Sequence, residues 1–179
     1  WTISSGTCPT SESTVTITNY ATPTTSTTGA DQTICGLTST SLGGNTPVNG
    51  TGAWSQTSGP GTTTFSASGT GSSTATATLY GTYTYTWTIS NGVCAPSTSE
   101  IEVTYYQTPT AATTGGTQNL CGTLESGALG GNTPVVGTGA WSIVSGGTGT
   151  FDDNTDPDAI FTADAYGTYV LRWTISNGV

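Results

Sequence analysis

The sequence repeats itself at a fixed interval, and this interval limits the folds that the chain can adopt. The string WTISSGTC at 1–8 recurs as WTISNGVC at 87–94, and WTISNGV follows at 173–179, with an offset of 86 residues each time. Cys35 and Cys121 keep the same offset. An interval of 86 residues is long enough for an independent small domain. We therefore expect similar units joined in tandem, each one packing around its own core.

Two Thr-Pro-Thr stretches, at 22–24 and 108–110, predict the boundaries between units, because proline interrupts strand pairing. On this division the N-terminal segment, residues 1–21, carries the terminal strands of a preceding repeat. The central region, residues 22–107, is a complete repeat. The C-terminal region, residues 108–179, lacks its last strand. Because the chain begins in mid-strand and without Met, we expect it to be a piece of a longer secreted polypeptide.

Strict alternation of apolar and polar residues predicts β-strands. Within 81–90, aromatic and aliphatic residues alternate with threonine, and 100–105 alternates again after an Asn-Gly turn signal. No stretch has helical periodicity. Short strands with turn signals every 8 to 12 residues are typical of an all-β sandwich of two antiparallel sheets. The expected core residues are Trp54, Tyr83, Tyr85, Trp87, Ile89, Ile101, Val103, Trp141, Tyr169, Leu171 and Trp173.

The composition argues against an enzyme. The chain has no His and no Lys, so neither a Ser-His or Cys-His nucleophile nor a phosphate-binding lysine can be assembled. We expect no catalytic residues and no cofactor. A formal net charge of -9 disfavours nucleic acid as a partner, and no apolar run is long enough for membrane insertion. Half of the chain is Thr, Ser and Gly, so its solubility depends on hydroxyl groups.

One acidic stretch has the beginning of a calcium-binding pattern. The alternate positions are Asp152, Asn154, Asp156 and Asp158. The pattern then fails, because Pro157 stands where a calcium loop needs glycine and Ala163 stands where it needs glutamate. These residues are a weak calcium candidate, and a solvated turn that uses its carboxylates to bind the backbone is the favoured interpretation. No metal site is predicted.

Several strings together resemble a known type of surface repeat. These are ADQTICG at 30–36, GTGAWS at 50–55, FTADAYGTYVLRWTISNGV at 161–179 and the Glu-Ile-Glu-Val strand at 100–103. In this combination they are similar to the PKD-like, immunoglobulin-like tandem repeats of giant Bacteroidetes cell-surface adhesins, such as the SprB-type gliding adhesins. The resemblance implies an extracellular filament of tandem immunoglobulin-like sandwiches. It implies no catalytic residues.

Four cysteines, Cys8, Cys35, Cys94 and Cys121, predict disulfides in a chain that otherwise has a secreted composition. Three pairings are open. Cys35 can bridge across a junction to a cysteine expected at position 180, Cys35 can bridge to Cys94 within one unit, or Cys8 can bridge to Cys35 and Cys94 to Cys121. The strand order expected for a sandwich places Cys35 and Cys94 at opposite poles of a unit, roughly 30 Å apart, whereas bridged Cα atoms lie within about 7 Å.

The function expected from these features is that of a structural or adhesive repeat segment in a secreted cell-surface filament. Its partners would be neighbouring copies of the same repeat, joined head to tail. The alternative is a glycan-binding module that recognises surface polysaccharide through exposed aromatic residues such as Tyr20, Tyr105 and Tyr106. Either function is extracellular and needs no catalysis.

Overall fold

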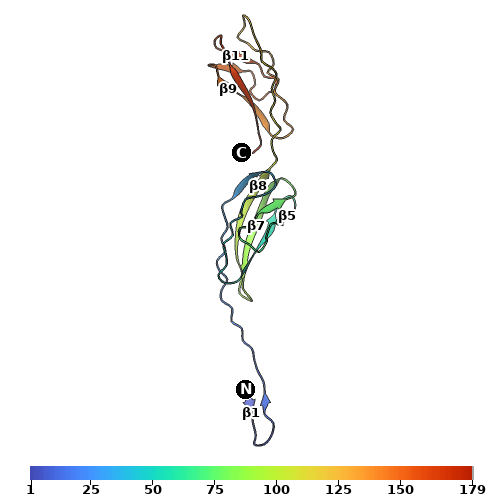
Figure 1. Cartoon of the computed structure of the whole chain (residues 1–179), viewed down its shortest axis with the longest axis vertical. Helices are drawn as coiled ribbons and strands as arrows, with labels where there is room; N and C mark the ends of the chain where they lie inside the picture. The colour runs from blue at the N-terminus through green and yellow to red at the C-terminus, as the bar shows by residue number, and fades with distance from the viewer. Residues whose placement is uncertain (179) are drawn as a thin grey trace.

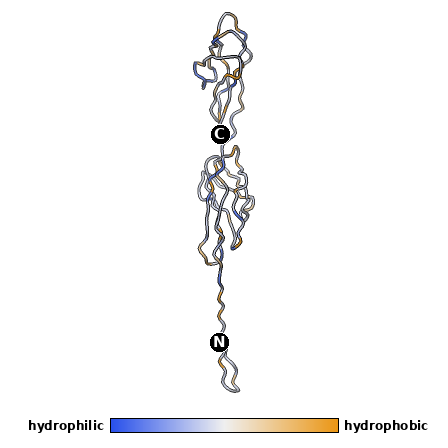
Figure 2. Tube along the Cα trace, turned by 90° about the vertical axis from the view of Figure 1, so that its left-hand side faces the viewer, coloured by the Kyte–Doolittle hydropathy of each residue, from blue (hydrophilic) through white to orange (hydrophobic). Residues whose placement is uncertain are grey.

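The all-β prediction is confirmed. The computed structural model describes residues 1–178, and within them every regular element is a β-strand. Since these residues contain no helix, no apolar helix of membrane-spanning length is found among them. The N-terminal segment, the central region and the C-terminal region follow one another along the long axis of the molecule (Figure 1, Figure 2).

The central region is built on a four-stranded sheet. Its strands lie in the order β3 (Gln32–Cys35), β8 (Ser97–Tyr106), β7 (Gly81–Ser90) and β4 (Thr51–Ser58). A second, two-stranded sheet pairs β5 (Thr63–Phe65) with β6 (Ala75–Ala77). The side chains of β6 pack into the same core as those of β7, so the two sheets are consistent with a β-sandwich.

One pairing differs from the antiparallel expectation. β3 and β8 are parallel, with Gln32 opposite Val103 and Cys35 opposite Tyr106. Parallel neighbours need a long crossover connection, and here the rest of the central region provides it. Alternation within each strand did not reveal this pairing, because the inward and outward pattern is the same for either direction.

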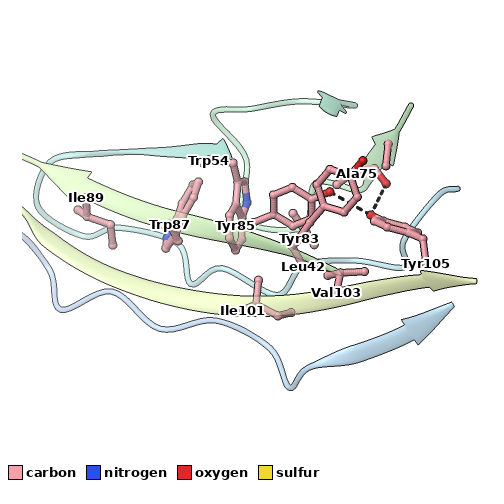
Figure 3. Packing of buried hydrophobic residues seen from close by; sticks show 11 residues of the cluster. Leu42, Trp54, Ala75, Tyr83, Tyr85, Trp87, Ile89, Ile101, Val103 and Tyr105 are labelled. Carbon is pink, nitrogen blue, oxygen red and sulfur yellow. Dashed lines mark hydrogen bonds between the residues drawn. The ribbon is translucent and has the colours of Figure 1, made fainter. Parts of the chain in front are cut away.

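The core of the central region is a row of aromatic rings on β7. Tyr83, Tyr85 and Trp87 have no exposed surface, and the ring of Trp54 lies 5.1 Å from that of Trp87 (Figure 3). The hydroxyl of Tyr105 lies 3.3 Å from that of Tyr85 and donates a hydrogen bond to the carbonyl of Ala75 at 3.0 Å. These hydrogen bonds satisfy hydroxyl groups that the core excludes from water.

The C-terminal region contains two separate two-stranded sheets. β9 (Thr138–Ser145) pairs with β12 (Val170–Ser176), and β10 (Gly149–Phe151) pairs with β11 (Phe161–Ala163). β9 has the same length and the same pattern of buried positions as β4. The rings of Trp141 and Trp173 lie 5.2 Å apart, close to the spacing of the corresponding pair in the central region.

Two expected core residues of this region are only half-buried. Tyr169 and Leu171 correspond to Tyr83 and Tyr85, which have no exposed surface. Leu171 nevertheless packs against the buried cluster of Trp141, Ala159 and Trp173, and the ring of Tyr169 lies 5.2 Å from that of Phe161. In the central region, β8 pairs with β7 and covers this part of the core, whereas among residues 1–178 β12 pairs with β9 alone.

The N-terminal segment extends away from the central region (Figure 1). It contains a short hairpin of β1 (Thr2–Ile3) and β2 (Ser11–Glu12). After this hairpin, Val15 and Ile17 are 84% and 77% exposed. Residues 13–20 therefore have a strand-like alternation but form no strand within the described chain.

Candidate functional site

The first junction joins the N-terminal segment to the central region through the turn that follows β7. The side-chain amide of Asn91 donates a hydrogen bond to the carbonyl of Ala21 at 2.9 Å. Gly92 has φ +57°, and a Cβ atom at this position would overlap the ring of Tyr20. Both the left-handed backbone and the close approach require glycine.

The second junction joins the central and C-terminal regions with the same contacts. Asn177 donates through its side-chain amide to the carbonyl of Gln107 at 2.7 Å. Gly178 has φ +87°, and a Cβ atom there would lie 2.6 Å from the ring of Tyr106. The contacting residues are each displaced by 86 positions from those of the first junction. The same sequence elements therefore build the same junction twice.

Each linker is also fixed to the region that follows it. The hydroxyl of Thr24 accepts hydrogen bonds from the backbone N–H groups of Val48 and Asn49, both at 2.9 Å. Thr110 accepts two such bonds from Val135 and Val136, at 3.0 and 2.9 Å. The Thr-Pro-Thr stretches are thus held by side-chain hydrogen bonds and do not serve as free hinges.

Two of the four cysteines, Cys35 and Cys94, lie at the junctions. Cys35 places its Sγ 3.7 Å from the hydroxyl of Thr108, and Cys94 places its Sγ 3.5 Å from the carbonyl of Ala21. Cys8, Cys35, Cys94 and Cys121 are all free thiols. The two pairings within the chain, Cys35 to Cys94 and the pair Cys8–Cys35 with Cys94–Cys121, are therefore not formed. Cys35 and Cys94 lie at opposite ends of the central region, beyond the reach of a disulfide. A disulfide across a junction, between Cys35 and a cysteine expected at position 180, stays a prediction.

The acidic stretch after β10 forms a turn that its own carboxylates stabilise. Asp152 accepts hydrogen bonds from the N–H groups of Asp153 and Ile160, both at 2.8 Å. Asp153 accepts bonds from the hydroxyl and the N–H of Thr155, and these bonds lower the pKa of its carboxyl group. Asp156 accepts one bond from the N–H of Asp158. The carboxylates point to the backbone, and residues 1–178 contain no group of three potential metal-ligating side chains.

Replacing Asp152 with Ala should lower the free energy of unfolding of the C-terminal region by about 1 kcal/mol, because the carboxylate holds two backbone donors. The matched control is Asp158→Ala, since that carboxylate accepts no hydrogen bond within the described chain. The control should change stability by no more than about 0.5 kcal/mol. Urea unfolding followed by tryptophan fluorescence measures both. Equal losses of unfolding free energy in the two variants would show that the negative charges, and not the hydrogen bonds of Asp152, stabilise the turn.

The aromatic residues named for glycan binding do not form one free surface. Tyr105 is buried and hydrogen-bonded in the core, so its assignment as an exposed residue was wrong. Tyr106 is half-buried and lies against Gly178, and Tyr20 lies against Gly92. The burial of Tyr105 agrees with the alternation within β8, where Ile101, Val103 and Tyr105 share the inward face. Tyr20 and Tyr106 belong to the junctions.

One concave feature is a groove of about 310 Å³ in the C-terminal region, beside β12. Its lining includes Ala112, Thr114, Val144, Leu171 and Trp173. It contains a single charged group, the guanidinium of Arg172, and no carboxylate.

Comparison with known proteins adds no further assignment: no family model matches the chain, and no curated protein matches it.

In the sequence, the Asn-Gly pairs indicate only turns. Their contact with the preceding linker depends on the three-dimensional path of the chain. The available signal was the recurrence of Asn91 and Tyr20 as Asn177 and Tyr106 at the same offset. Two polar or aromatic positions that recur together in a repeat are candidates for contact between units.

Proposed function

We propose that the chain is a structural and adhesive segment of a secreted cell-surface filament, built from tandem immunoglobulin-like (PKD-like) sandwiches, and that it has no catalytic activity. The observation that supports this proposal best is the repeated junction. Asn91 and Gly92 contact the linker before the central region in the way that Asn177 and Gly178 contact the linker before the C-terminal region.

A junction of this kind suits a filament because it defines the relative orientation of neighbouring units. Three contacts act together at each junction. An asparagine side chain donates a hydrogen bond to the linker, a tyrosine ring packs against a glycine, and the hydroxyl of the linker threonine accepts backbone hydrogen bonds. If every junction repeats these contacts, the same small rotation is added at each step, and an array becomes an extended fibre of regular shape. Neither a cofactor nor a charged cleft is needed.

The surface chemistry supports an extracellular location. Only 6% of the residues are charged, and half of the chain is Thr, Ser and Gly, with exposed hydroxyl side chains such as that of Thr82. Hydroxyl groups hydrate the surface without depending on ionic strength. In this proposal the partners are neighbouring repeats of the same kind, and surface polysaccharide is the alternative partner.

Immunogold labelling tests the location and form directly. Antibodies raised against the purified chain should label thin filaments outside the cell that makes it. Labelling confined to the cell interior would contradict the proposal. Calorimetric titration with surface polysaccharides tests the alternative, because a structural segment without a glycan site should give no saturable heat.

Replacing Gly92 with Ala should loosen the first junction. The new Cβ would overlap the ring of Tyr20, so the N-terminal segment should separate from the turn and sample more orientations. Small-angle X-ray scattering should then show a broader distribution of long distances than in the unchanged chain. The expected cost of the left-handed backbone alone is about 1–2 kcal/mol.

Gly6→Ala is the matched control for this variant. Gly6 occupies the corresponding position of the repeat and has φ +56°, but a Cβ atom there would meet no neighbour within 4 Å. It carries the same backbone cost without the collision. If both variants change the scattering equally, the contact with Tyr20 does not orient the junction.

A further inference from the structure

One peptide bond of the C-terminal region joins an aspartate to a proline. It links Asp156 to Pro157 in the turn between β10 and β11. An aspartate carboxylate can attack the carbonyl carbon of its own residue, because the product is an unstrained cyclic anhydride. Proline favours the reaction as a leaving group, since its ring nitrogen becomes a basic secondary amine when the bond breaks. This bond is therefore chemically labile.

Two N–H groups point at the carbonyl oxygen of the same bond. The indole Nε1–H of Trp141 donates to the carbonyl of Asp156 at 3.0 Å, and the backbone N–H of Ala159 donates to it at 3.1 Å. Trp141 and Ala159 are both buried, so the surrounding core holds the two donors in place. Attack on the carbonyl carbon places negative charge on this oxygen. Fixed N–H donors at that position are the arrangement that stabilises an oxyanion.

Both sides of the bond are also held. The Oδ1 of Asp156 accepts a hydrogen bond from the N–H of Asp158 at 2.9 Å, whereas its Oδ2 accepts none within residues 1–178 and is available for attack. The carbonyl of Pro157 accepts a hydrogen bond from the N–H of Gly131 at 2.8 Å. The side chain of Asp156 is exposed, so water can reach it. Attacking group, carbonyl and water therefore meet at one place.

The central region has the same donors without the labile bond. There the indole of Trp54 donates to the carbonyl of Thr70 at 3.2 Å, and the N–H of Ser73 donates to the same carbonyl at 3.0 Å. Thr70 and Gly71 stand in the places of the aspartate and the proline, at the offset of 86. The donors are thus common to both regions, and the reactive pair is specific to the C-terminal one.

We propose that the chain cleaves itself between Asp156 and Pro157. The Oδ2 of Asp156 attacks the carbonyl carbon of the same residue, while the N–H groups of Trp141 and Ala159 stabilise the charge on the carbonyl oxygen. The carbon–nitrogen bond then breaks, and the nitrogen of Pro157 takes up a proton from the solvent. Water opens the anhydride and leaves two carboxyl groups on Asp156. The sum is the hydrolysis of one peptide bond, with no change of oxidation state.

Cleavage would nick the chain without dividing the molecule. The fragments are 1–156 and 157–179, and the shorter one carries β11 and β12. β11 pairs with β10 through three residue pairs, and β12 pairs with β9 through seven, so strand pairing holds the fragments together. The reaction is a single event without turnover. It goes beyond the proposed function and does not depend on it.

The test is incubation of the purified chain, followed by mass spectrometry. Release of the amine needs a proton, so the buffer is mildly acidic, at about pH 5, which is still above the ordinary pKa of aspartate. Fragments 1–156 and 157–179 should accumulate in equal amounts. The same chain unfolded in guanidinium chloride should be cleaved at least about tenfold more slowly, because its donors are no longer fixed. Cleavage that is no faster in the folded chain would overturn the proposal.

Substitution of the attacking residue tests its role. Asp156→Thr introduces the residue that the central region has at this place, and it should abolish the cleavage. Asp158→Ala is the matched control, because it removes a carboxylate of the same turn that accepts no hydrogen bond within the described chain. The control should be cleaved at the unchanged rate. Equal losses in both variants would contradict the attack by Asp156.

Substitution of the indole donor tests the stabilisation of the oxyanion. Trp141→Phe removes one of the two N–H groups and should slow the cleavage about tenfold. Trp173→Phe is the matched control, since it alters the same core but removes an indole that donates elsewhere, to the carbonyl of Asn132 at 3.2 Å. If both variants lose the same rate, the loss reflects the stability of the region, and Trp141 does not act on the carbonyl.

Trapping identifies the intermediate. An anhydride acylates amines, so methoxyamine added at high concentration should be incorporated at Asp156 in part of fragment 1–156. Fragments that never carry methoxyamine would show that water attacks the peptide bond directly, and they would contradict the proposed step. A chain that stays intact would overturn the cleavage but not the proposed function, which immunogold labelling tests separately.

Discussion

Replacing Trp87 with Ala is expected to lower the free energy of unfolding of the central region by about 3–5 kcal/mol. The side chain has no exposed surface and packs against Trp54. Its indole N–H donates to the carbonyl of Asn45 at 3.2 Å. Gly44 and Gly52 approach the ring so closely that neither could carry a Cβ atom without displacing it. Such a tightly enclosed site leaves a cavity when the ring is removed.

Urea unfolding, followed by circular dichroism and fluorescence, measures the loss. Trp173→Ala is the matched variant in the C-terminal region, where Gly139 and Trp141 enclose the ring in the same way. Each substitution should shift only the transition of its own region, because each tryptophan belongs to a separate core. A single substitution that shifts the whole unfolding curve would show that the two regions unfold as one cooperative unit.

Alkaline pH is expected to unfold the central region before the C-terminal region. Burial raises the pKa of Tyr85 and of Tyr105 above the ordinary value of about 10. Since the folded state retains these protons when the unfolded state has lost them, the stabilisation is complete below about pH 10 and declines above it. Each tyrosine should lower the free energy of unfolding by up to about 1.4 kcal/mol per pH unit.

Circular dichroism and tyrosinate absorbance, recorded together against pH, should show that ionisation of the buried tyrosines coincides with unfolding. The double variant Tyr85→Phe and Tyr105→Phe should lose much of this pH dependence. The C-terminal region has Leu171 in the place of Tyr85 and provides an internal comparison. Complete tyrosine ionisation near the ordinary pKa in a chain that keeps its folded spectrum would contradict the prediction.

Local features of the sequence predicted much of the fold. The alternation at 81–90 predicted a strand over the residues that form β7, and its inward side chains are buried. The prediction succeeds because successive side chains of a strand point to opposite faces, so apolar residues recur at every second position when one face packs on a core. The glycines at the turns are likewise explained by local backbone geometry, because a positive φ favours glycine.

Features that depend on distant parts of the chain could not be predicted in this way. The parallel pairing of β3 with β8 joins residues about seventy positions apart, and nothing in either strand specifies its neighbour. The half-burial of Tyr169 and Leu171 does not follow from the alternation of β12, because the corresponding residues of β7 are covered in the central region by the pairing with β8. The junction contacts of Asn91 and Gly92 depend on where the preceding linker passes. Local patterns determine which face of a strand is buried, but not which strand covers it.

The parallel pairing of β3 and β8 has a mechanical consequence. β3 continues from the linker at one end of the central region, and β8 runs directly into the linker at the other end. Tension applied along the long axis of the chain would pull these two strands in opposite directions along their shared edge. All hydrogen bonds between 32–35 and 103–106 would then be sheared together, whereas strands pulled apart from one end break their bonds one at a time. The pair would act as a clamp that keeps the core closed under load.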